Sequence, residues 1–111
     1  MSGWIGVDLD GTLAEYDRWR GPDHIGNPIP AMVARVKDWL RTGHEVRIFT
    51  ARVWNEPEDH PVTNQIQHWC LRHIGAMLPV TCMKDYGMIE LWDDRAVQVI
   101  PNTGQRADGA E

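Results

Sequence analysis

The chain alternates short apolar runs of strand character with segments of helical apolar spacing, and this alternation limits the possible folds most strongly. Strands are expected at residues 4–9, 45–51, 79–84, 88–94 and 97–101, and helices at 28–43 and 62–74. Strands that alternate with helices favour a mostly parallel sheet with helices on both faces. We therefore expect an α/β fold: a single small Rossmann-like domain with a sheet of about five strands.

Both expected helices carry one apolar face and clear end signals. In the first, prolines precede the first turn and Gly43 stands at the expected C-cap, with apolar positions at Met32, Val33, Val36, Trp39 and Leu40. In the second, Gly75 marks the end, and the apolar positions are Ile66, Trp69, Cys70 and Ile74. Each helix should pack this face against the sheet.

Composition excludes several classes of protein. A length of 111 residues, with 42% apolar and 24% charged residues, fits one folded domain. The formal charge of −5 argues against a surface for duplex nucleic acid or anionic membrane. Cys70 and Cys82 are too few for a disulfide framework or a zinc site. The N-terminus has neither a charged leader nor a long apolar stretch, so we expect no membrane span and a cytoplasmic protein.

Three apolar runs become polar at the same end. "WIGV" leads into Asp8 and Asp10, "VRIF" leads into Thr50, and "IELW" leads into Asp93 and Asp94. Ligands bind outside the carboxyl ends of the strands in open parallel sheets. The sequence therefore predicts one shared site at this edge.

The predicted site is rich in carboxylates. Asp8 and Asp10 are two positions apart, so on a strand their side chains point the same way, and Asp93 and Asp94 arrive from another strand. Four carboxylates without Cys or clustered His suit a hard cation with oxygen ligands, and we expect Mg²⁺. Such a cation would neutralise part of the cluster and attract a phosphate.

The neighbouring residues suit phosphate chemistry. One carboxylate of the first pair can attack phosphorus and form an aspartyl-phosphate, while the other transfers protons. Gly11 lets the chain turn at the strand end. Thr12 and Thr50 offer donors to phosphate oxygens, and Lys84 offers a positive charge.

The ordered motifs resemble those of the haloacid dehalogenase-like hydrolases, most of which are Mg²⁺-dependent phosphatases. "VDLDGTL", the Thr50 of "IFTAR", Lys84 and "LWDDR" look like the four family motifs, within residues 4–101. The resemblance implies a phosphatase domain at 1–101, and the polar, Gly-rich sequence that follows predicts a flexible tail at 102–111. It implies these roles: Asp8 as nucleophile, Asp10 as general acid/base, Thr50 as phosphate ligand, Lys84 steadying the phosphoaspartate, Asp93 and Asp94 as the acidic metal pair. Asp8 and Asp10 complete the expected metal site, Asp10 also through its backbone carbonyl.

The connections are too short for the cap domain that larger relatives carry. The chain therefore resembles capless members, including the phosphatase part of polynucleotide kinase-phosphatases, and a nucleotide or a nucleic acid terminal phosphate is the expected substrate. Trp19 and Trp54 could stack on a base or only cover the sheet edge. Arg52 resembles an arginine of nucleotide-acting relatives, but a surface ion pair with Glu56 or Asp59 is the alternative.

Other readings stay open at the level of sequence. The same scaffold could bind phosphate or nucleotide without turnover, or transfer the phosphoryl group to an acceptor other than water. Thr50 could be only a good strand former, and Lys84 could mark a solvated strand end. The acidic segment around His60 suggests a second metal site, but a flexible loop is favoured because it has prolines on both sides. The oligomeric state is not determined.

Overall fold

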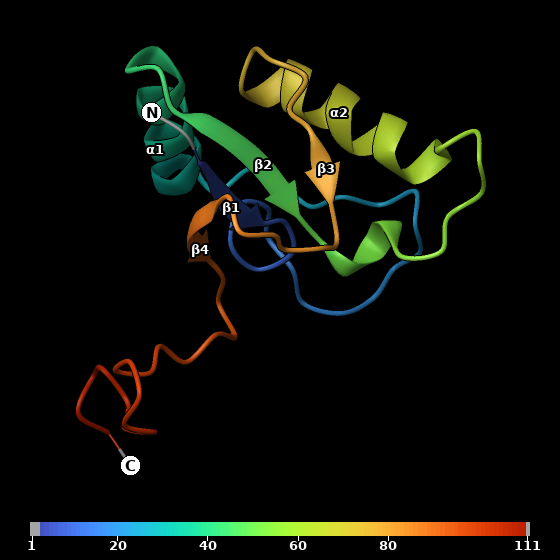
Figure 1. Ribbon diagram of the computed structural model, residues 1–111. Helices are drawn as coiled ribbons and strands as arrows, with labels where there is room; N and C mark the ends of the chain where they lie inside the picture. Colours follow the sequence, from blue (N-terminus) through green and yellow to red (C-terminus); the bar gives the residue numbers. More distant parts are fainter. Residues whose placement is uncertain (1–2, 111) are drawn as a thin grey trace.

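The computed structural model describes residues 3–110, which form two α-helices, a short 3₁₀-helix and four strands (Figure 1). In chain order these are β1 (Trp4–Asp8), α1 (Pro30–Arg41), β2 (Glu45–Phe49), the 3₁₀-helix η1 (Ala51–Val53), α2 (Pro61–His73), β3 (Val80–Thr81) and β4 (Met88–Trp92). Both predicted helices and the first four predicted strands are present. The strands are shorter than expected, and β3 has only two residues.

All four strands are parallel and follow the order β3-β2-β1-β4. β1 is central: Val7 pairs with Ile48 of β2 on one side and with Trp92 of β4 on the other. Parallel strands present their carboxyl ends at one edge. The predicted α/β fold with a mostly parallel sheet is confirmed, with four strands in place of five.

Both helices pack on one face of the sheet, so the expectation of helices on both faces is wrong. Ile5 and Val7 of β1 share a single buried cluster with Val36 of α1 and Ile66 of α2. The path from β1 through β2 to β3 moves in one direction, and right-handed crossovers in one direction place their helices on the same face. A helix on the second face would have to come from the β3–β4 connection, and residues 82–87 contain none.

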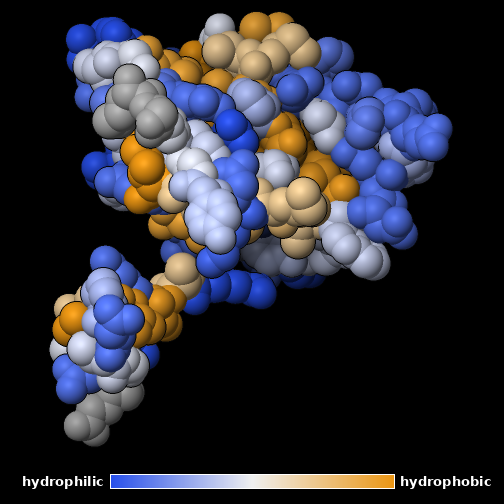
Figure 2. All heavy atoms as spheres, in the orientation of Figure 1, coloured by the Kyte–Doolittle hydropathy of each residue, from blue (hydrophilic) through white to orange (hydrophobic). Residues whose placement is uncertain are grey.

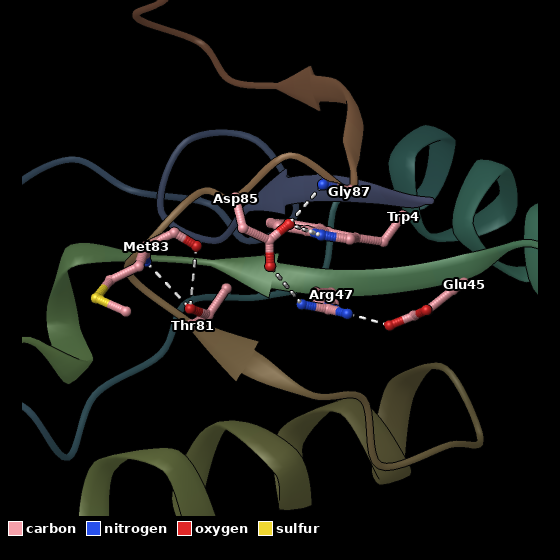
Figure 3. A network of polar contacts seen from close by, with 7 residues as sticks. All are labelled: Trp4, Glu45, Arg47, Thr81, Met83, Asp85 and Gly87. Carbon is pink, nitrogen blue, oxygen red and sulfur yellow. Dashed lines mark hydrogen bonds and ion pairs between the residues drawn. The ribbon is translucent and has the colours of Figure 1, made fainter. Parts of the chain in front are cut away.

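The second face of the sheet is covered by side chains and the 82–87 loop. The indole N–H of Trp4 donates to Asp85 Oδ1 at 2.8 Å, and the Gly87 N–H donates to the same oxygen at 2.8 Å (Figure 3). The Arg47 guanidinium lies 4.5 Å from the centre of the Trp4 ring and forms ion pairs with Glu45 and Asp85. Trp4 is only 2% exposed as a result, although no helix covers it.

The predicted fifth strand at 97–101 does not join the sheet. Val99 instead forms an isolated antiparallel bridge with Arg106, and the Ile100 N–H donates to the Gln105 carbonyl. Only residues 93–96 separate this segment from β4, whereas a parallel neighbour needs a crossover of about a dozen residues. The segment after β4 leads away from the sheet (Figure 1), and its lobe carries exposed apolar side chains (Figure 2).

Glu56 fastens the start of α2. Its carboxylate accepts hydrogen bonds from the backbone N–H groups of Val62 and Thr63, both at 3.0 Å, and from the Thr63 hydroxyl. The Glu56 side chain is 7% exposed, and His60 turns the chain into the helix with a left-handed φ of 53°. This carboxylate caps the helix, which argues against its use in a second metal site.

The described part of the chain carries no inserted domain, in agreement with the expected lack of a cap. Its longest connection between elements is residues 9–29, between β1 and α1. Neither described helix combines the length and apolar character that a membrane crossing requires.

The cap at Glu56 predicts a pH-dependent contribution to stability. Burial opposes ionisation, but hydrogen bonds from Thr63, His60 and Val62 lower the pKa of Glu56 below 4.5. A lowered pKa gives stability that is present above pH 4.5 and is lost as the pH falls through the folded-state value. Glu56→Gln should lower the free energy of unfolding at pH 7 by about 1 kcal/mol, and should reduce its dependence on pH below 5.

Denaturant unfolding of wild type and variant between pH 3 and 7 tests this expectation. Glu58→Gln is the matched control, because Glu58 is an exposed carboxylate of the same loop and makes no described bond to α2. Equal stability losses in the two variants would contradict the capping role.

Candidate active site

The turn after β1 arranges the first pair of carboxylates. The Leu9 carbonyl accepts N–H hydrogen bonds from Thr12, Leu13 and Ala14, and Leu9 and Leu13 are fully buried. These apolar anchors hold the turn against the core. Asp8 at the end of β1 and Asp10 in the turn are both left half-buried at the carboxyl edge of the sheet.

Asp8, Asp93 and Asp94 form a carboxylate cluster. One oxygen from each of the three lies within 4.8 Å of the others. Asp93 and Asp94 follow β4 directly, and β4 pairs with β1, so the register of the two strands brings the three residues together. The Thr12 hydroxyl lies 3.4 Å from Asp8 Oδ2 and 3.2 Å from Asp94 Oδ1, and accepts a bond from the Asp94 N–H.

The environment of Asp8 disfavours its charge. Burial raises the pKa of Asp8 to about 7, together with a hydrogen bond to Asp94 and the negative charges of Asp93, Asp94 and Asp10. Three carboxylates with only oxygen donors fit a hard divalent cation such as Mg²⁺. A positive charge held at the carboxylate cluster would favour the ionised form of Asp8.

The absence of a side chain at Gly11 leaves space for the Asp94 carboxylate in the carboxylate cluster. Its φ of +90° lies in the region that favours glycine, and a Cβ there would lie 2.6 Å from Asp94 Oδ2. The Gly11 N–H donates to the Ala14 carbonyl, which closes the turn. The glycine expected to let the chain turn therefore also lets Asp94 approach β1.

The side chain of Asp10 points to Arg52 and not into the carboxylate cluster. Arg52 Nε donates to Asp10 Oδ2 at 2.7 Å, and Nη2 donates to Oδ1 at 2.8 Å. The expected metal site of four carboxylates is therefore a cluster of three, with the Asp10 carboxylate bound elsewhere. The alternative pairing of Arg52 with Glu56 or Asp59 is wrong, because its carboxylate partner lies 42 residues earlier.

Thr50 joins the site from β2. It is 3% exposed, its N–H donates to the Thr81 carbonyl, and its side-chain oxygen accepts the Arg52 N–H at 3.2 Å. This contact caps η1 and directs the chain back over the edge of the sheet. Thr50 is thus part of both the sheet edge and the wall of the site.

One pocket of about 560 Å³ collects most of the predicted site residues. It is lined by Asp8, Asp10, Tyr16, Trp19, Phe49, Thr50, Ala51, Arg52, Asp93, Asp94 and Arg95. Tyr16 and Arg95 did not figure among the predicted site residues. For Arg95 a signal existed, because it directly follows the pair of aspartates that "LWDDR" carries.

Four predicted residues are not among those that line this pocket: Gly11, Thr12, Lys84 and Trp54. Gly11 and Thr12 lie in the turn after β1 and contact the carboxylate cluster at Asp94, whereas Lys84 and Trp54 lie elsewhere. Lys84 lies in the 82–87 loop and lines a separate pocket with Asp85 and Tyr86. Trp54 is 73% exposed and follows η1. Lys84 was expected from its charge and its likeness to a family motif, and Trp54 from its place in a loop after a strand; neither signal fixes the direction of a side chain in a loop.

Comparison with known proteins supports the fold and leaves the activity open. No protein-family model and no curated protein matches the chain. A solved structure, described as a conserved protein from Bacteroides thetaiotaomicron, superimposes with a TM-score of 0.60 at 25% sequence identity. The match covers 92% of this chain and 84% of that chain. The chain is therefore similar to this protein over nearly its whole length.

Substitution of Gly11 tests the geometry of the carboxylate cluster. Gly11→Ala should move Asp94 and weaken the binding of Mg²⁺ about tenfold or more, as measured by isothermal titration calorimetry. Gly43→Ala is the matched control, because Gly43 has a φ of +89° and nothing within 4 Å of a new Cβ.

Both variants should lose about 1–2 kcal/mol of stability to backbone strain, and only Gly11→Ala should change cation binding. Unchanged cation affinity in Gly11→Ala would show that the carboxylate cluster does not hold the ion. So would the failure of the wild type to bind Mg²⁺ at millimolar concentration.

Proposed function

We propose that this protein is a Mg²⁺-dependent phosphomonoester hydrolase that works through an aspartyl-phosphate on Asp8. The convergence of Asp8 with Asp93 and Asp94, in a pocket that also contains Thr50, carries the proposal. These residues come from three strand ends, and they match in order the motifs that resemble haloacid dehalogenase-like hydrolases. The lack of an inserted domain in the described chain agrees with the capless type.

Each step of the proposed reaction uses a residue of the pocket. An Asp8 oxygen attacks phosphorus as the bond to the leaving oxygen breaks, and Asp10 gives that oxygen a proton. Water then attacks phosphorus, Asp10 takes its proton, and the bond between Asp8 and phosphorus breaks to release phosphate. When bound at the carboxylate cluster, Mg²⁺ supplies positive charge that offsets the phosphoryl oxygens. Thr50 is suited to donate a hydrogen bond to one of those oxygens.

The positive groups of the site differ from those that the resemblance implies. Arg52 and Arg95 line the pocket, whereas Lys84 lines another. We therefore assign the steadying of the phosphoryl group first to Arg95, which follows the acidic pair. Lys84 could take this role only after a movement of the 82–87 loop.

A second function is favoured by one specific contact. Arg52 donates a hydrogen bond to each oxygen of Asp10, so in this arrangement Asp10 can exchange a proton only through its remaining lone pairs. A protein that binds a phosphate or a nucleotide without turnover would keep such a contact permanently. Hydrolysis requires that Asp10, while Arg52 holds it, present a remaining lone pair of one oxygen to the substrate.

Replacement of the proposed nucleophile separates these functions. Wild type should release phosphate from an aryl phosphate in the presence of Mg²⁺, and Asp8→Asn should abolish release while the circular dichroism spectrum stays native. Asp10→Asn should lose a factor on the order of 10² to 10⁴ in turnover. Asp38→Asn is the control, because Asp38 is an exposed carboxylate of α1 paired with Arg41.

Released phosphate and retained ligand should be measured together, on a panel of mono- and oligonucleotides with 3′- or 5′-phosphates. Tight retention without release by wild type would favour the binding function. Wild-type turnover in Asp8→Asn would rule out the covalent mechanism.

The aromatic residues of the loops test the expected nucleotide substrate. Trp19 lines the pocket and is 55% exposed, whereas Trp54 lies outside it. If a base stacks on Trp19, Trp19→Ala should raise KM for a nucleotide about 5- to 150-fold and leave an aryl phosphate nearly unaffected. Trp54→Ala provides the matched control and should change neither. An equal effect of Trp19→Ala on both substrates would argue against base stacking.

A further inference from the structure

Arg52 lies where three segments of the chain meet. It begins the return of the chain after β2, and its side chain binds Asp10 in the turn after β1 through two hydrogen bonds. The two side chains are 6% and 19% exposed, so this fork-shaped ion pair is largely withdrawn from solvent. Charge-assisted pairs of this kind are the strongest hydrogen bonds in proteins, and they also fix direction.

The same guanidinium binds the segment of residues 16–25, which we call the specificity loop. Nη2 donates to the His24 carbonyl at 2.8 Å, and Nη1 lies 3.4 Å from the Pro22 carbonyl. The guanidinium carbon Cζ of Arg52 lies 4.9 Å from the centre of the Trp19 ring, within reach of a cation–π contact. Arg52 therefore touches the loop at three residues and the β1 turn at one.

The base of the specificity loop is fixed by other contacts. The Glu15 N–H donates to the Asn27 carbonyl, and Ala14 forms an antiparallel bridge with Pro28. Gly26 lies so close to the Glu15 carbonyl that a Cβ would come within 2.0 Å of it. Between these ends the loop is largely exposed, and Arg52 is its main polar contact with the exit of β2.

We propose that Arg52 is a positioning residue that couples Asp10 to the specificity loop. It holds the Asp10 carboxylate outside the carboxylate cluster and fixes Trp19 as a wall of the pocket. The chemical consequence for proton transfer depends on the proposed hydrolase function, whereas the mechanical coupling does not. The role differs from the direct substrate binding expected from the sequence, because four of the five guanidinium N–H groups already have partners.

Lysine cannot replace this arrangement. A guanidinium presents donors in a rigid plane that matches a carboxylate and stacks on an aromatic ring, whereas an ammonium group is a compact charge. Arg52→Lys should therefore keep the attraction to Asp10 and lose the contacts with the loop carbonyls and Trp19. Arg52→Gln should lose both.

Limited trypsin digestion of the full chain tests the mechanical part. Arg18 and Arg20 are exposed cleavage sites within the specificity loop, and mass spectrometry separates cuts there from cuts elsewhere. Arg52→Gln should speed cleavage at these sites about tenfold or more, the factor expected in a local opening equilibrium when a charge-assisted hydrogen bond is lost. Arg52→Lys should fall between Arg52→Gln and wild type. Wild-type cleavage rates in both variants would overturn the proposal.

The coupling to Asp10 makes a separate prediction. Asp10→Ala should also speed cleavage at Arg18 and Arg20, although Asp10 is not part of the loop. The double variant Asp10→Ala/Arg52→Gln should be no faster than Arg52→Gln alone, because Asp10 acts on the loop through Arg52. Effects that multiply in the double variant, or a wild-type rate in Asp10→Ala, would overturn the coupling.

The second face of the sheet offers a matched control. Arg47 also stacks on a tryptophan and pairs with carboxylates, but it lies beside Trp4 and Asp85 (Figure 3) and outside the pocket. Arg47→Gln should lose comparable contacts and leave cleavage at Arg18 and Arg20 unchanged. Faster cleavage in Arg47→Gln as well would mean that loss of an arginine–tryptophan contact destabilises the protein generally, and would overturn the specific role of Arg52.

Kinetics then distinguish positioning from simple structural support. With an aryl phosphate that does not reach the loop, Arg52→Gln should lower kcat about 10- to 100-fold and change KM little, because the proton donor is misplaced. A rise in KM with unchanged kcat would overturn the positioning role. If wild type shows no hydrolysis, the proposed function fails, and the digestion experiments still decide the coupling.

Discussion

The parallel pairing of β1 with both of its neighbours is the constraint on which the remaining structure depends. Ile5 and Val7 are buried on one side of β1, and the ladders to β2 and β4 fix where the three strands end. Any polar residue that follows one of these strands must then lie beside the others. The site is thus a consequence of strand register, and the core that the two helices cover holds it in place.

The acidic ends of β1 and β4 bring like charges together at one edge of the sheet, and the carboxylates there differ in their partners. Asp10 receives a full positive partner in Arg52, so its charge is balanced within the chain. Asp8 has acidic neighbours, and its pKa is raised to about 7 by burial and by those neighbours. In a phosphoryl-transfer site this difference is useful, because the carboxylates of Asp8, Asp93 and Asp94, which lack an arginine partner in the described part of the chain, are the ones that a cation would bind.

Because both helices pack on one face of the sheet, the two faces are stabilised in different ways. The covered face carries the continuous core, in which Trp69 of α2 also donates to the Gly26 carbonyl and so fixes the base of the specificity loop. The second face is held by a local network in which Asp85 accepts bonds from Trp4 and Gly87. Two arginine–tryptophan contacts of similar chemistry thus serve different ends: Arg47 shields the sheet, and Arg52 joins the segments of the site.

The sequence by itself determined the elements and the residues at the strand ends, because apolar period and helix end signals act over short distances. It therefore predicted the positions of Asp8, Thr50, Asp93 and Asp94 in one pocket. The tertiary structure alone decided which side chains pair across loops, since nothing local relates Arg52 to Asp10 or directs Lys84 away from the pocket. It also decided that both helices share one face and that residues 97–101 leave the sheet, because these outcomes depend on strand order and on the reach of short connections.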